Sequence, residues 1–129
     1  MTQPKHEHIR WDEPFLDVTA VLRRWGFSHD TDRYFRASWE ARHPWGIPGP
    51  IYVGDDDVCG MGPELAPNNV CLFDSTGEFL YRQATSEYEL WQLLDAAWCN
   101  PVSAYAMDGD SHWTPASIAA WWESIQPVR

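Results

Sequence analysis

The stretch 44–69 limits what this chain can fold into more than any other segment. It reads PWGIPGPIYVGDDDVCGMGPELAPNN and contains five prolines and five glycines. Proline removes a backbone donor and glycine adds backbone freedom, so regular elements longer than a few residues are not expected. The stretch also contains apolar residues that favour burial, namely Trp45, Ile47, Ile51, Tyr52 and Leu65. We therefore predict a long structured loop with a short strand near 51–53, and long loops in compact domains are often functional.

A β-hairpin is predicted directly after this loop, over about 70–82. Two β-rich runs flank a short Asp-Ser-Thr-Gly turn that ends at Gly77. A helix should follow, because Ser86 and Glu89 form an S-x-x-E capping box and an apolar stripe runs to Trp98. The Asn100-Pro101 pair ends this helix.

Helices are also predicted near both ends of the chain. From Glu13 onward, apolar residues recur at helical spacing from Phe15 to Trp25. Gly26 follows them at a position that suits a C-terminal cap. A second, weaker helix is expected from about 28–31 to Ala41, with Tyr34, Phe35 and Trp39 as its apolar residues. The last helix should begin at Thr114-Pro115 and bury Ile118, Trp121, Trp122 and Ile125. The predicted fold is α+β, with a small antiparallel sheet (the hairpin and the 51–53 strand) packed against about four helices.

Length and composition indicate a single globular domain. The 129 residues are 44% apolar, which excludes a disordered chain, and only the polar stretch 1–11 is expected to be flexible. The N-terminal stretch has no apolar segment of the kind found in secretory signals, and no run suits a membrane span. Three widely spaced cysteines fit neither a secreted disulfide scaffold nor iron–sulfur ligation. We expect a cytoplasmic protein without a cofactor.

Charge is distributed very unevenly along the chain. Residues 1–43 contain seven of the nine Lys/Arg and seven of the nineteen Asp/Glu. Residues 44–129 contain only Arg82 and Arg129 against twelve acids, so the whole net charge of −10 belongs to this part. An acidic field suits a basic protein partner and repels nucleic acid and anionic membranes.

Two acidic motifs are candidate contacts for such a partner. The first is Asp55, Asp56 and Asp57 on the Gly/Pro-framed loop, which matches a calcium loop only in part because Cys59 and Ala66 replace required ligands. Adjacent carboxylates on a loop suit Arg or Lys of a partner. The second motif lies at 108–113. The candidate partner-binding residues are Asp55, Asp56, Asp57, Glu64, Asp108 and Asp110, with Glu87 and Asp95 of the 86–99 helix next.

An alternative interpretation places a site for a small molecule, a metal ion or an enzymatic reaction at 55–59 and 108–112. Asp108, Asp110 and His112 supply two carboxylates and an imidazole within five residues, which suits a metal ion or a shared proton. The Asp108-Gly109 pair is also a strong turn signal before a helix, so a structural turn explains the same residues. No phosphate-loop pattern or nucleophile elbow is present, and neither a catalytic residue nor a metal site is assigned.

Several short motifs resemble a known group of proteins. These are WGIPGPIY at 45–52, CGMGP at 59–63, APNNV at 66–70 and DGDSHWT at 108–114. Together they resemble small acidic actinobacterial proteins found beside polymorphic toxin genes and interpreted as immunity proteins. The resemblance implies a non-enzymatic inhibitor that binds a cognate basic toxin domain, such as a nuclease or deaminase. The acidic charge independently favours such an interface, and so does the expectation that Trp11, Trp25, Trp39 and Trp45 cannot all be fully buried in so small a domain.

Overall fold

The computed structural model describes residues 16–27, 35–54, 60–73 and 77–126, and the fold is mixed α+β as predicted. The elements follow one another as α1 (Val18–Arg24), η2 (Trp39–Ala41), β1 (Tyr52–Val53), α2 (Met61–Leu65), β2 (Val70–Phe73), β3 (Gly77–Leu80), α3 (Glu87–Cys99), β4 (Tyr105–Ala106), η3 (Gly109–Ser111) and α4 (Pro115–Ser124).

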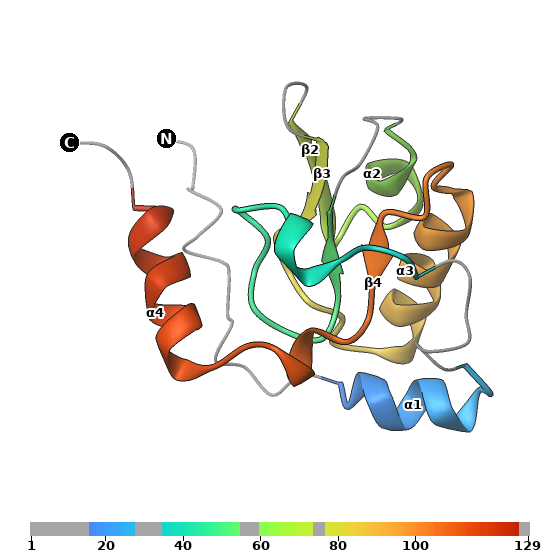
Figure 1. The fold of residues 1–129 in the computed structure, drawn as a ribbon. Coiled ribbons are helices and arrows are strands. Elements are labelled where there is room, and N and C mark those ends of the chain that lie inside the picture. Colours follow the sequence, from blue (N-terminus) through green and yellow to red (C-terminus); the bar gives the residue numbers. More distant parts are fainter. Residues whose placement is uncertain (1–15, 28–34, 55–59, 74–76, 127–129) are drawn as a thin grey trace, which may run out of the picture.

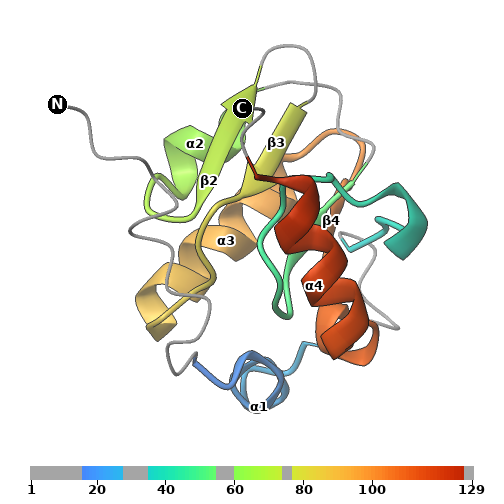
Figure 2. The same cartoon turned by 90° about the vertical axis from the view of Figure 1, so that its left-hand side faces the viewer.

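The strands lie at the centre and helices surround them. Figures 1 and 2 show α3 on one side of the strands, α4 on the opposite side and α1 across one end. Helix α2 packs against α3 and β2. Among the described helices, none has the length and apolar character needed to cross a lipid bilayer.

The predicted hairpin and the predicted short strand are both present, in two separate antiparallel sheets. Strand β2 pairs with β3 through the registers Val70↔Leu80 and Phe73↔Gly77. Strand β1 pairs instead with β4, which the sequence did not predict. Gly77 adopts a φ of 89°, which a residue with a side chain rarely adopts, and this explains glycine at the end of the turn.

The predicted helix after the hairpin is confirmed. The Ser86 side chain accepts a hydrogen bond from the Glu89 backbone N–H, and the leucines of α3 are buried in the hydrophobic core. The Glu89 carboxylate accepts from the Thr85 N–H and not from that of Ser86, so the reciprocal half of the predicted capping box is displaced by one residue. It also binds Arg82, which fixes the end of the hairpin against α3.

The N-terminal region departs from the prediction. Helix α1 begins only at Val18, after an Asp17 cap, although Gly26 takes the predicted capping position with a φ of 88°. The prediction of a second helix is wrong over the described residues 35–41, because the only helical element there is the short η2 turn. Phe35 forms a β-bridge with Ala104, and the backbone N–H groups of the next two residues donate to Ser103 and Tyr105 carbonyls. Pairing with this distant segment replaces the helix.

Helix α2 was not predicted, since it lies within the Pro/Gly-rich stretch. Pro63 is tolerated because the first turn of a helix needs no partner for its N–H groups. Gly62 is required for a different reason. A Cβ at this position would lie 2.2 Å from Glu78 Oε1 and 2.5 Å from the Tyr105 hydroxyl.

Glu78 is fully buried, although the sequence counts it as part of an acidic surface. Its carboxylate accepts hydrogen bonds from the Tyr105 hydroxyl at 2.7 Å and from the Gly62 N–H at 3.0 Å. This carboxylate therefore joins β3, β4 and α2, and it is unavailable to a partner.

Gln83 performs a similar role for the long loop. Its amide accepts from the Ile51 N–H and donates to the carbonyls of Ile47 and Ile51. Gly49 passes so close that a Cβ there would lie 2.5 Å from the Gln83 side chain. The predicted structured loop is thus held by a buried side chain that follows the hairpin.

The final helix begins as predicted, with Thr114 as the N-cap and Pro115 in the first turn. Its packing is looser than predicted. Trp121 is buried, Ile118 and Ile125 are half-buried, and Trp122 is 41% exposed. Helix α4 therefore covers the core along a narrow stripe and leaves space beside it.

Candidate functional site

The structure does not bring the predicted acidic contacts together. Asp55, Asp56 and Asp57 lie outside the described residues. Glu64 is exposed on α2, whereas Asp108 and Asp110 lie at η3, at the other end of the molecule in both ribbon views (Figures 1 and 2). A single acidic patch built from these residues therefore has no support in the described part of the chain.

Asp108 takes part in an internal network. Its two carboxylate oxygens contact the Tyr52 hydroxyl at 2.7 Å and His112 Nε2 at 3.1 Å. Burial and the hydrogen bond to Asp108 raise the pKa of Tyr52 far above its usual range, so the hydroxyl stays protonated and donates. Both oxygens have partners within the fold, so the geometry fits a structural turn.

Asp110 remains a candidate contact. Its side chain is exposed, and no described Lys or Arg forms a salt bridge with it. Partial burial and the neighbouring Asp17 carboxylate raise the pKa of Asp110. A cation from a partner would relieve this repulsion.

An aromatic stack adjoins the Asp108 network. The His112 ring lies parallel to Trp39 at 4.7 Å, and the Arg42 guanidinium lies 3.7 Å from the centre of the Trp39 ring. Trp113 meets Trp39 edge-on at 4.9 Å. Cation–π contact and the hydrogen bond from Arg42 to the Trp39 carbonyl hold the guanidinium in one orientation.

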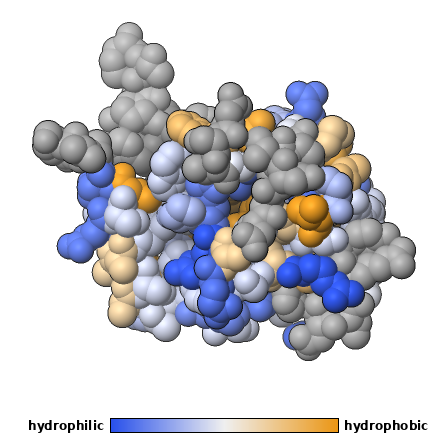
Figure 3. Space-filling view, turned by 45° about the horizontal axis from the view of Figure 1, so that its top comes forward, coloured by the Kyte–Doolittle hydropathy of each residue, from blue (hydrophilic) through white to orange (hydrophobic). Residues whose placement is uncertain are grey.

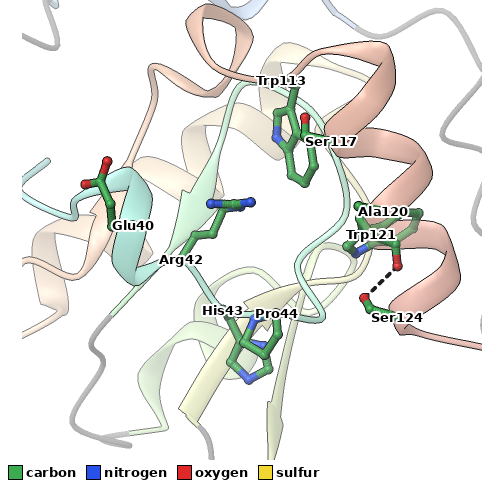
Figure 4. Close-up of a pocket in the computed structure, with 9 residues that line it drawn as sticks. All are labelled: Glu40, Arg42, His43, Pro44, Trp113, Ser117, Ala120, Trp121 and Ser124. Atoms are coloured by element: carbon green, nitrogen blue, oxygen red, sulfur yellow. Dashed lines mark hydrogen bonds between the residues drawn. The ribbon is translucent and has the colours of Figure 1, made fainter.

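A cleft of about 380 Å³ lies between this stack and α4. We call it the α4 cleft. Its lining residues, drawn in Figure 4, are Glu40, Arg42, His43, Pro44, Trp113, Ser117, Ala120, Trp121 and Ser124. Small-molecule sites usually have this size, apolar walls and a few polar groups. None of these residues was a predicted site, because the two walls come from distant parts of the sequence.

The described residues give no support for a metal centre at the alternative site at 55–59 and 108–112. Residues 55–59 lie outside the described part of the chain. Within the described part, no three His, Cys, Asp or Glu side chains are grouped so that they could hold a metal ion. Cys99 is exposed at the end of α3 and Cys71 is half-buried on β2.

The exposed face of α3 combines aromatic and acidic side chains. Tyr88 is 70% exposed and Trp91 is 45% exposed, with Glu87 and Asp95 four positions before and after Trp91. Trp91 is held by edge-on contacts with Trp25 at 5.8 Å and with Trp98 at 5.7 Å. We call Glu87, Tyr88, Trp91 and Asp95 the α3 face. Glu87 and Asp95 were secondary candidates in the sequence, but nothing there showed that Tyr88 and Trp91 stay exposed.

Other apolar side chains are exposed at separate places. Trp45 and Phe73 meet edge-on at 4.8 Å beside the hairpin, and Trp122 lies on α4. On the side drawn in Figure 3, apolar residues form several patches among hydrophilic ones. On the α3 face, the described carboxylates of Glu87 and Asp95 lie one helical turn from an exposed aromatic ring.

Comparison with known proteins adds no identification: no family model, curated protein or solved structure matches this chain. The function must therefore be argued from the geometry and charge of the chain itself.

Proposed function

We propose that this protein is a cytoplasmic, non-enzymatic inhibitor that binds a basic protein, in the manner expected of an immunity protein against a nucleic-acid-directed toxin. The observation that carries this proposal is the α3 face, where two exposed aromatic rings stand between carboxylates. Aromatic side chains in desolvated contacts supply most of the energy of many interfaces.

Unbalanced negative charge supports the same proposal. Arg24 and Arg82 are engaged in salt bridges with Glu87 and Glu89. Several other carboxylates form no salt bridge with a described residue, and these include Glu40, Glu64, Asp95, Asp110 and Glu123. Such a field accelerates encounter with a basic protein and makes the encounter rate fall with added salt.

The proposed inhibition is occlusion of a basic cleft. Enzymes that act on nucleic acid attract the phosphate backbone with Lys and Arg. Asp95 of the α3 face, which forms no salt bridge with a described residue, would occupy the position of a phosphate, while Tyr88 and Trp91 exclude water around it. Asp55, Asp56 and Asp57 stay predicted contacts of the same partner.

The test combines capture with a growth assay. Immobilised protein should capture one basic protein from its native host. Capture should weaken at about 0.5 M salt, because the Debye screening length then falls to a few ångströms. The captured protein should arrest growth when it is expressed alone, and co-expression of the inhibitor should restore growth.

Variants of the α3 face make this test specific. The double variant Tyr88→Ala/Asp95→Lys should lose both capture and protection, whereas Trp122→Ala removes an exposed tryptophan elsewhere and should retain both. If the double variant protects as well as the parent protein, the α3 face is not the interface. If the captured protein is harmless on its own, inhibition of a toxin is the wrong function.

A further inference from the structure

The α4 cleft contains the positively charged side chain of Arg42, which the proposed inhibitor function does not use. Arg42 extends from the 40–44 segment toward α4, while Trp113 and Trp121 form the facing wall (Figure 4). Glu40 also lines the cleft, but its carboxylate points away from Arg42 in this view. Arg42 is thus the charged side chain that extends into the cleft (Figure 4).

Arg42 has no carboxylate partner among the described residues. The only described hydrogen bond of its guanidinium runs from Nη1 to the Trp39 carbonyl at 3.0 Å, and the guanidinium carbon lies 5.3 Å from the Trp113 ring centre. Burial lowers the pKa of this guanidinium, although Glu40 partly opposes the effect. A half-buried cation with several unused donors is stabilised by an anionic ligand.

Unpaired indole donors supply a second, independent observation. The Nε1 atoms of Trp113 and Trp121 are buried and have no hydrogen-bond partner in the described part of the chain. Trp121 itself is only 6% exposed. In Figure 4 the nitrogen atoms of both rings lie toward the Arg42 side of the cleft. Buried donors without acceptors carry a free-energy cost that a ligand oxygen would remove.

The shape and chemistry of the walls define the rest of the ligand. The indole rings, Pro44 and Ala120 offer flat apolar surfaces, and a volume of about 380 Å³ accommodates a one- or two-ring body. We propose that the α4 cleft binds an aromatic carboxylate, with its carboxylate on Arg42 and the indole N–H groups and its ring between Trp113 and Trp121.

A free aromatic acid and a peptide that ends in phenylalanine both carry this chemistry. The probes are therefore 2-naphthoate and N-acetyl-glycyl-phenylalanine, each compared with its neutral carboxamide. The readout is the set of ¹⁵N-labelled indole resonances of the full chain, assigned by single Trp→Phe variants. The Trp113 and Trp121 resonances should move for at least one acid, and the corresponding amide should bind roughly tenfold more weakly or worse.

Matched variants separate the site from general charge effects. Arg42→Gln should weaken binding of the acid at least roughly tenfold, because it removes charge-assisted hydrogen bonds. Arg23→Gln makes the same change in net charge at an exposed position of α1 and should have no effect. Ala120→Phe fills the cleft from α4 without altering Arg42, and it should also abolish binding.

Several results would overturn the proposal. One is that neither acid moves the Trp113 and Trp121 resonances. Another is that the amides bind as tightly as the acids, since the carboxylate would then be irrelevant. If Arg42→Gln unfolds the protein, Ala120→Phe decides the location: undiminished binding in that variant excludes the α4 cleft. Binding by only one of the two acids identifies the source of the carboxylate.

Discussion

Replacing Gln83 by methionine removes the hydrogen bonds that hold the long loop to the hairpin. Methionine matches glutamine closely in length and volume, so the change leaves the packing of this buried position nearly intact. The lost bonds are one of 2.8 Å to the Ile51 carbonyl and two of 3.3 Å, to the Ile47 carbonyl and from the Ile51 N–H.

The expected cost follows from these contacts. A net contribution of about 1 kcal/mol for each bond, with a further penalty for a buried N–H left without an acceptor, gives a loss of about 3 kcal/mol in the free energy of unfolding. For a domain of this size, the melting temperature should fall by roughly 10 °C. Urea and thermal unfolding followed by circular dichroism measure both quantities.

Gln92 on α3 provides the matched control. Its Oε1 is buried without a partner, so Gln92→Met removes no described hydrogen bond and should change the unfolding free energy by less than about 0.5 kcal/mol. Equal stability of Gln83→Met and the parent protein would refute the argument that this amide holds the loop. Equal losses in the two variants would show that methionine itself, and not the missing hydrogen bonds, is responsible.

Three further predictions concern helix ends and ionisable groups. Burial alone would raise the pKa of Glu89, but hydrogen bonds, first of all from Arg82, outweigh burial and lower it below 4.5. Glu89→Gln should therefore cost about 1–3 kcal/mol at neutral pH, a difference that shrinks in urea titrations as pH falls through the lowered pKa. The pKa of Asp110 is raised by burial and by Asp17, so its ionised form opposes folding. Asp110→Asn should therefore raise the melting temperature at neutral pH and leave it unchanged well below the ordinary carboxyl pKa. A lower melting temperature of this variant at neutral pH would contradict this reasoning. Ser86→Ala should cost about 1 kcal/mol by removing the α3 cap, Ser86→Asp should restore most of it, and indistinguishable denaturation curves for all three proteins would exclude capping as a source of stability.

Local signals in the sequence predicted the elements that depend on near neighbours. The Ser86 cap, the Thr114-Pro115 helix start and the hairpin pairing with a positive φ at Gly77 are all present in the structure. Each of these involves groups within a few residues of one another, so the sequence pattern and the hydrogen bond describe the same contact.

Elements that depend on distant pairing could not be predicted in this way. Phe35 and Trp39 suit one face of a helix by spacing, but the backbone beside Phe35 pairs with residues 103–105. Strand β4 contains only Tyr105 and Ala106, too short for a periodic signal. No pattern in the sequence specifies such a partner.

The candidate sites show the same limit. Charge counting treated Glu78 and Asp108 as surface carboxylates, yet one is buried and the other is held by Tyr52 and His112. The exposure of Tyr88 and Trp91 depends on how α3 packs, and no local pattern in the sequence specifies that packing.

The pairing of β1 with β4 has a consequence for synthesis of the protein on the ribosome. The backbone hydrogen bonds of the hairpin and of α3 join residues close in sequence, so these elements can form while the C-terminal part is still being translated. Strand β1 must wait, because its partners, and the acceptor of the Tyr52 hydroxyl 56 positions later, have not yet emerged. During this interval the nascent chain exposes Ile51 and Val53, which are buried in the finished fold, so premature termination before β4 should release an aggregation-prone fragment.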